Sequence, residues 1–313
     1  MHEQTSSRIA SLAKRVREAT LEILWKQWAS VGSPASARGG AQSIIDPEAL
    51  VLTSLALREQ ERRLWDLVAD WARVGSRFLS VQRIGNLLPA YPDATRGSLE
   101  EFASLAQEAG KDHRWKKYAQ GVVKVQPHRE KLLASEPSLV EGSTLMLRLR
   151  SGIGVGIKAD MLAFLIGCAG SSISAKMIAD ATHYTEPAVR RAADDMTTAQ
   201  LVFSSQGTPA EYHVIRPAWK KLLALKEYPA WMYWHEVFAL AAQFLIWEHE
   251  THTRTVSEYA RQVRYRQFFS EHRTAFSRHG LAPDVQPRTG ELIGPGEFEE
   301  LLVQLMGKTG KSV

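Results

Sequence analysis

Residues 174–196 read SAKMIADATHYTEPAVRRAADDM, and the fold predicted for this protein depends on this stretch. Two short helical patterns lie on either side of His183-Tyr184-Thr185. Ser174 is placed to cap the first helix and Thr185 the second, because Ser and Thr hydroxyls accept hydrogen bonds from the first free backbone N–H groups. Pro187 falls in the first turn of the second helix, where a missing N–H is tolerated. We therefore expect two helices joined by a short turn.

The segments around this pair extend the pattern on both sides. KADMLAFLIGCAG, residues 158–170, predicts a preceding helix that ends at its glycines and is followed by a short extended piece. After the pair come LVFSS, the Gly/Pro loop QGTPAE and YHVI, residues 201–215, which together predict a β-hairpin. The expected order is helix, strand, helix, turn, helix, strand, loop, strand.

In this order, residues 158–216 resemble the winged-helix domains of bacterial transcription regulators of the MarR and ArsR type. SAKMIADAT matches the positioning helix, TEPAVRRAADDM the recognition helix and SSQGTPAEY the wing. LRLRSGIGVGIKADMLAFLIG, joined to this module, also resembles bacterial winged-helix proteins without an assigned activity. The resemblance implies a protein that binds double-stranded DNA.

A recognition helix fits the major groove of B-DNA, where each base pair presents its own pattern of donors and acceptors. Val189, Ala192 and Met196 are spaced to face inward, which leaves Arg190 and Arg191 outward as candidates for guanine edges or phosphates. The candidates for contacts to the DNA backbone are Lys176, His183, Thr185, Ser205 and Gln206.

Two basic stretches rich in aromatic residues flank this module. Residues 111–131 suit a phosphate backbone, but a solvated basic helix that covers Trp115 would have the same sequence. Residues 254–278 set arginines among aromatic side chains. If DNA is bound, we expect both stretches to supply positive charge, and the candidates are Lys116, Lys117, Arg261 and Arg264.

The charge of the whole chain supports an anionic partner only weakly. The formal net charge is +5 over 313 residues, and within the predicted module Lys and Arg are nearly offset by Asp and Glu. Winged helices also serve as protein-interaction domains, because a fold does not fix a function. The alternative is therefore an interaction module that docks onto a protein partner, such as an antitoxin or a phage-defence accessory protein.

The fold class predicted for the chain is mainly α, with helical N- and C-terminal regions around a central winged helix-turn-helix that carries a small β-hairpin wing. The predicted regions are an amphipathic helix at 1–30, a helical domain at 44–145, the winged helix-turn-helix at 150–222, a C-terminal helical region at 228–280 and a tail at 281–313. A helix-turn-helix pattern at 61–90 is a possible second DNA-reading unit. The apolar stripe of residues 1–30 fits either packing onto the protein's own core or a dimer seam.

The sequence contains no motif that predicts catalysis. SGIGVGIKAD, residues 151–160, satisfies neither G-x-x-x-x-G-K-[ST] nor G-x-G-x-x-G. Cys168 is the single cysteine and lies in an apolar helical pattern, which favours a small core residue in a reducing compartment. His249 and His252 are one helical turn apart but do not form H-E-x-x-H. We expect no cofactor, no metal site and, since the longest apolar run is about half of the ~20 residues required, no membrane span.

Together these patterns predict a cytoplasmic bacterial protein that binds specific DNA sequences and regulates transcription. A repressor is the expected activity. We expect a homodimer, because two-fold pairing of single winged helices gives affinity and defines the spacing of half-sites.

Overall fold

The computed structural model describes residues 2–34, 40–119, 137–168, 172–253, 260, 263, 267, 268, 270 and 271. The chain divides into two compact units, Met1–Leu24 with Glu236–Val313, and Trp25–His235. The described residues are mainly helical with a small three-stranded antiparallel sheet, which confirms the mainly α class. Among them, no helix is both long enough and apolar enough to cross a membrane.

The first unit contains most of α1 (His2–Ser30) and of α11 (Trp234–Thr253). Val16 and Leu24 of the predicted apolar stripe are fully buried, so the stripe packs within the chain at these positions rather than forming an exposed seam. In α11, Phe244 stacks on Trp247 with ring centroids 6.1 Å apart, and Phe268 lies 5.9 Å from Phe244. The aromatic crowding of this stretch therefore serves a core.

The second unit begins with a helical segment. Its elements are α2 (Pro47–Ala56), α3 (Arg62–Val74), η1 (Ser76–Phe78), α4 (Val81–Leu87), η2 (Leu88–Ala90), α5 (Thr95–Glu108) and η3 (His113–Lys117). Every residue of α2 is buried, as expected for a helix without a polar face. Beneath it, Trp28 donates from Nε1 to Ser54 Oγ at 2.9 Å and meets Trp71 edge to face at 5.5 Å.

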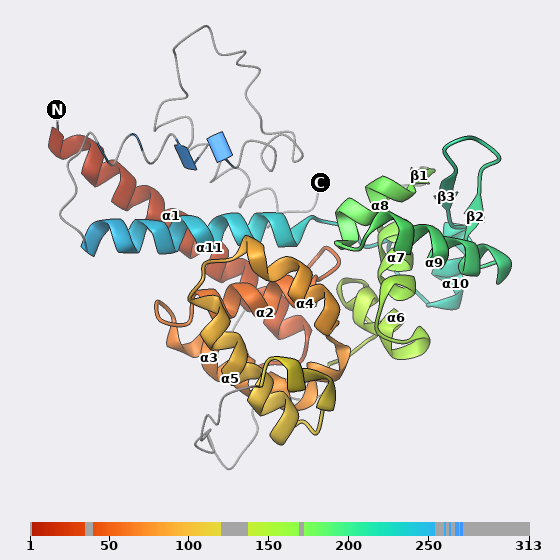
Figure 1. Ribbon diagram of the computed structural model, residues 1–313, viewed down its shortest axis with the longest axis horizontal. Helices are drawn as coiled ribbons and strands as arrows, with labels where there is room; N and C mark the ends of the chain where they lie inside the picture. The colour runs from red at the N-terminus through yellow and green to blue at the C-terminus, as the bar shows by residue number, and fades with distance from the viewer. Residues whose placement is uncertain are drawn as a thin grey trace, which may run out of the picture. The chain divides into compact units, whose positions relative to one another are not determined.

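A second group of elements follows in the same unit (Figure 1). These are η4 (Gly142–Thr144), α6 (Leu145–Ile153), α7 (Ile157–Gly167), β1 (Ile173–Ser174), α8 (Ala175–Thr182), α9 (Glu186–Thr198), β2 (Phe203–Ser204), β3 (Glu211–His213) and α10 (Arg216–Leu222). One hydrophobic core joins α6 and α7 to α8, α9, β1, β3 and α10. Val189, Ala192 and Met196 are buried as their spacing predicts, so the opposite face of α9 is exposed.

The sheet has the strand order β1-β3-β2, with both pairs antiparallel. Ile173 pairs with Tyr212, and Phe203 pairs with His213. The hairpin predicted at residues 201–215 is therefore present, and Ser205 closes it because its backbone N–H donates to Glu211 O at 2.8 Å.

Segments that are distant in the sequence connect the two groups of elements. The Ile44 N–H donates to Ala230 O, and the Ile45 N–H donates to Ser143 O, each at 2.9 Å. Trp234 Nε1 donates to Ser43 Oγ at 3.1 Å. The predicted regions 44–145 and 150–222 thus lie within one compact unit.

Candidate nucleic-acid interface and the ionic cluster behind it

The exposed face of α9 carries both predicted base-reading arginines. Arg190 and Arg191 are exposed, and Arg190 Nη2 forms an ion pair with Glu186 one turn earlier. In the part of the chain that the structure describes, Arg191 makes no ion pair. Arg191 is therefore the arginine of α9 that a ligand reaches without breaking an existing pair.

Four of the predicted backbone contacts lie on α8, at the start of α9 and in the hairpin loop. Lys176 and Gln206 are exposed. Thr185 is the N-cap residue of α9, as predicted, but its side chain makes no capping hydrogen bond, so its exposed hydroxyl is not used by the helix. Ser205 is half-buried, and its hydroxyl accepts from the Glu211 N–H at 3.0 Å, which makes it part of the hairpin closure.

His183, predicted to contact the DNA backbone, is half-buried beside a second histidine. It caps the C-terminus of α8 in a left-handed conformation, with φ 56° and ψ 37°. Its ring centroid lies 4.1 Å from that of the buried His235, in an edge-to-face arrangement. The imidazole of His183 therefore does not join the exposed face formed by Arg190 and Arg191.

Of the four basic residues predicted to supply charge on either side of the module, the structure describes two. Lys116 and Lys117 are exposed in η3, a short 3-10 helix that packs against α5. Trp115 is buried beside them and meets Phe102 edge to face at 5.0 Å. The other two candidates, Arg261 and Arg264, lie outside the described residues.

The charges around α9 are nearly balanced. Besides Glu186, the helix carries Asp194 and Asp195 on its exposed side. Lys158, at the start of α7, forms an ion pair with Asp195 at 2.7 Å. The face offers localised positive charge at Arg191 and no broad positive surface.

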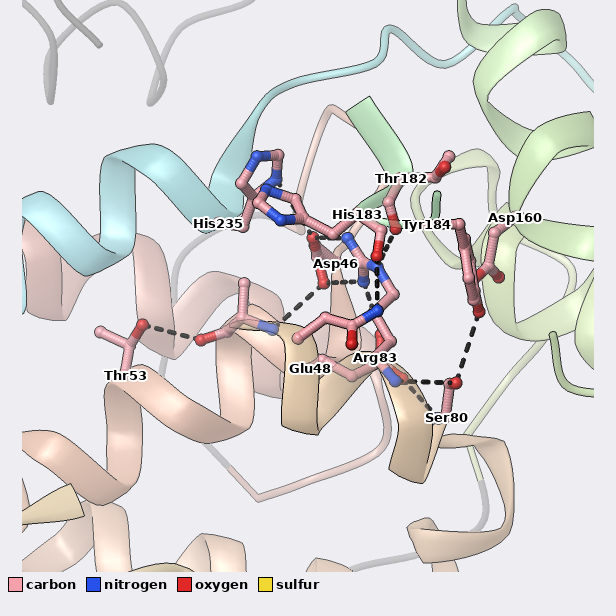
Figure 2. Close-up of polar contacts among 12 residues, drawn as sticks. Asp46, Glu48, Thr53, Ser80, Arg83, Asp160, Thr182, His183, Tyr184 and His235 are labelled. Atoms are coloured by element: carbon pink, nitrogen blue, oxygen red, sulfur yellow. Dashed lines mark hydrogen bonds and ion pairs between the residues drawn. The ribbon is translucent and has the colours of Figure 1, made fainter. Parts of the chain in front are cut away.

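A buried ionic cluster lies in the same compact unit, and no sequence pattern predicted it (Figure 2). Its charged members are Asp46, Glu48, Arg83, Arg150 and Asp160. They come from α2 and its N-cap, α4, α6 and α7, and their side chains are at most 2% exposed. Charged side chains that are buried to this extent require ion pairs and hydrogen bonds to offset the loss of water, and each member of the cluster has them.

Arg150 uses all five of its N–H groups in this cluster. Its guanidinium binds both oxygens of Asp160 and both oxygens of Glu48, at 2.6 to 3.0 Å, and donates to Phe78 O at 2.7 Å. Arg83 binds both oxygens of Asp46 and one oxygen of Glu48. The planar fork of arginine suits such two-pronged contacts.

The cluster extends to the turn between α8 and α9. Arg83 Nε donates to Thr182 O at 2.8 Å, and Asn86 Nδ2 of the same helix donates to His183 O at 2.7 Å. Tyr184 Oη donates to Asp160 Oδ2 at 3.0 Å and lies 3.3 Å from Ser80 Oγ. The turn that leads into α9 is therefore fixed by α4 and by α7.

The electrostatics of the cluster follow from its burial and its arginines. Burial opposes ionisation of Asp46, but the charges and hydrogen bonds of Arg83 and His235 together outweigh it, so the pKa of Asp46 lies far below its usual range. Burial and the neighbouring Asp160 charge raise the pKa of Tyr184, which keeps its hydroxyl protonated as a donor. His235 Nδ1 lies 3.8 Å from Asp46 Oδ2.

Groups with metal-binding or nucleophilic chemistry do not gather elsewhere in the described part of the chain. Across residues 2–34, 40–119, 137–168 and 172–253 and the few described beyond, no three His, Cys, Asp or Glu side chains are arranged to hold a metal ion. Cys168 is half-buried at the end of α7, and burial raises the pKa of its thiol to about 11. A thiol with this pKa is a poor nucleophile at neutral pH.

Comparison with known proteins finds no matching family model, no matching curated protein and no matching solved structure.

Proposed function

We propose that residues 158–216 form a winged helix and that the protein is a transcription regulator that binds duplex DNA through α9. The observation that carries the proposal is the exposed face of α9. Arg190 and Arg191 are adjacent on this face, and the other face of the helix is buried. A helix presented in this way fits the major groove, and arginine forms two-pronged contacts with guanine.

The order of elements supports this proposal. α7, β1, α8, α9, β2 and β3 follow one another as the helix, strand, helix, helix, strand and strand of a winged helix. The sheet order β1-β3-β2 puts the strand before α8 beside the last strand of the hairpin. Exposed Lys176 on α8 and Gln206 in the hairpin loop are the neighbouring candidates for phosphates.

The proposal is tested by fluorescence polarisation with two labelled duplexes, one of random sequence and one that the protein has selected from a random pool. Arg191→Ala is expected to weaken binding to the selected duplex about five- to a hundredfold, the usual range for one arginine that reads a base. Binding to the random duplex should change much less, because the phosphate contacts remain.

Arg96→Ala is the matched control, because Arg96 is an exposed arginine of α5 and its loss changes the net charge equally. The proposal predicts that this variant binds both duplexes as the wild-type protein does. Equal loss of affinity in Arg96→Ala and Arg191→Ala would mean that net charge, and not α9, governs binding.

A repressor of this class acts as a dimer on paired half-sites, and homodimerisation belongs to the proposal. Light scattering coupled to size-exclusion chromatography, with and without the selected duplex, measures it. Two chains per duplex are expected, and one chain per duplex would remove this part of the proposal.

A protein-interaction module is the second candidate, and the balanced charge around α9 favours it. Met177 on α8 is 53% exposed beside Lys176, so the same surface offers an apolar contact. The absence of binding to either duplex at low salt would select this candidate. In that case a partner retained by the wild-type protein should be lost with Met177→Asp.

A further inference from the structure

The C-terminus of α8 is held by a helix that lies outside the predicted winged helix. The last carbonyls of a helix lack partners within it. Here Thr182 O and His183 O accept hydrogen bonds from Arg83 and Asn86, two side chains of α4 that are 99 and 97 residues away in the sequence.

These two bonds act on a short turn. His183 is in the left-handed region, Tyr184 is buried, and Thr185 is already the N-cap of α9. The direction in which α9 leaves α8 therefore depends on few backbone angles, and α4 holds the carbonyl at the left-handed position.

The Arg83 side chain is fixed in place, because its guanidinium donates hydrogen bonds to Asp46 and Glu48 in the buried cluster. Tyr184 is held separately, because its hydroxyl donates to Asp160 of α7. The turn thus has one support from within the predicted winged helix, at α7, and one from outside it, at α4.

We propose that α4 sets the orientation of α9 toward DNA and that Asn86 is a positioning residue of the DNA-binding site. This inference rests on the proposed function. It adds that the segment from α2 to α5 belongs to the DNA-reading unit, so that a change in this segment alters the affinity for DNA through the turn.

Asn86 is the residue that can be tested without unfolding the protein. Its side chain is exposed, whereas Arg83 is fully buried. Gln82 is also exposed on α4, one turn earlier, so Gln82→Ala is the matched control for Asn86→Ala. Both changes remove one neutral amide from the same short helix.

The first measurement is amide hydrogen exchange of residues 183–189 by mass spectrometry, on the full chain without DNA. Exchange in this segment is expected to be faster in Asn86→Ala than in the wild-type protein and in Gln82→Ala, with the thermal midpoint unchanged. Unchanged exchange would overturn the positioning role of Asn86, whether or not the protein binds DNA.

The second measurement is the affinity for the selected and the random duplex as a function of salt. Mutations along such coupled elements change affinity about two- to thirtyfold, and Asn86→Ala should lose affinity for the selected duplex by a factor in this range. The salt slope should stay the same, because a residue that touches no phosphate releases no counterion.

The other outcomes of these two measurements also decide whether Asn86 positions α9. Faster exchange with unchanged affinity for the selected duplex would show that the orientation of α9 does not matter and would overturn the inference. A lower salt slope would make Asn86 a phosphate contact instead. If the wild-type protein bound no duplex while Arg190 and Arg191 were intact, the proposed function itself would fail, and the role of Asn86 in DNA recognition with it.

Discussion

Replacing Arg150 by Met is the sharpest test of the buried ionic cluster. Methionine has a similar length and no charge, so the change removes the charge and the five hydrogen bonds of Arg150 without opening a large cavity. Glu48 would keep Arg83 and the Ser80 N–H as partners, but Asp160 would keep only Tyr184 among the contacts described above.

Removing one partner of a buried ion pair costs about 3 to 5 kcal/mol, because the other charge is left buried and uncompensated. Glu48 and Asp160 are both fully buried, so we expect the upper part of this range. With an m-value of roughly 3 kcal/mol per molar urea, about 4 to 5 kcal/mol corresponds to a fall of about 1.3 to 1.7 M in the midpoint of urea unfolding. Tryptophan fluorescence follows the transition.

Lys158→Met is the control, because the Lys158 side chain is 44% exposed and its pair with Asp195 lies at the surface. Exposed pairs contribute about 1 kcal/mol or less. If Arg150→Met lowered the midpoint no more than Lys158→Met does, the buried cluster would contribute no more to stability than an exposed ion pair. The double variant Arg150→Met/Asp160→Asn should recover part of the loss, since it removes the uncompensated charge.

Three further predictions concern single groups. Asp46→Asn keeps an N-cap but removes a carboxylate whose pKa is lowered in the folded protein. The stabilisation by Asp46 is complete above its unfolded pKa of about 4 and is lost as the pH falls below it. The free energy of unfolding, measured with urea between about pH 5 and 2, should therefore depend less on pH in the variant than in the wild-type protein. The free energy of unfolding of His183→Asn, from urea titrations, should lie within about 0.5 kcal/mol of the wild-type value, whereas that of His183→Val should be lower by about 1 to 2 kcal/mol. The reason is that the left-handed backbone conformation of residue 183 tolerates Asn and penalises β-branched residues. Cys168 should react slowly with iodoacetamide at pH 7, faster as the pH approaches 11, and rapidly at pH 8 in urea; fast reaction of the folded protein at pH 7 would contradict its raised pKa.

Local patterns in the sequence predicted the helices and the hairpin. The N-cap at Ser174 was readable because it precedes a helical pattern, and its side chain accepts a hydrogen bond from the Met177 N–H as expected. The buried positions of α9 followed from their spacing alone. These features depend on neighbours a few residues away, and such neighbours are visible in a sequence.

The ionic cluster could not be predicted in the same way. Arg83 lies within residues 61–90, the stretch whose pattern suggested a second DNA-reading unit. In the structure Arg83 is fully buried and its guanidinium is bound to Asp46 and Glu48, so it is not available to DNA. A buried arginine and an exposed one have the same local sequence, and the partners that distinguish them are 35 or more residues away.

The position of the His183 ring could not be predicted for a related reason. A histidine in a turn before a predicted recognition helix is well placed for a phosphate, and local sequence contains nothing against it. Its ring instead meets His235, 52 positions later, a contact that depends on how the chain returns to this turn. Arg190 and Arg191 remain exposed because their positions depend only on the periodicity of α9.

The contacts of Arg150 decide which fragments of this protein keep the buried cluster when they are expressed alone. Its partners Glu48, Phe78 and Asp160 belong to three stretches of chain, and a fragment that starts at residue 150 would keep only the last of them. Such a fragment would carry Arg150 and Tyr184 at a cut surface, with Ile44 gone from the core that it shares with α6 and α7. The smallest piece worth expressing alone therefore begins ahead of residue 43, well before the first residue of the predicted winged helix.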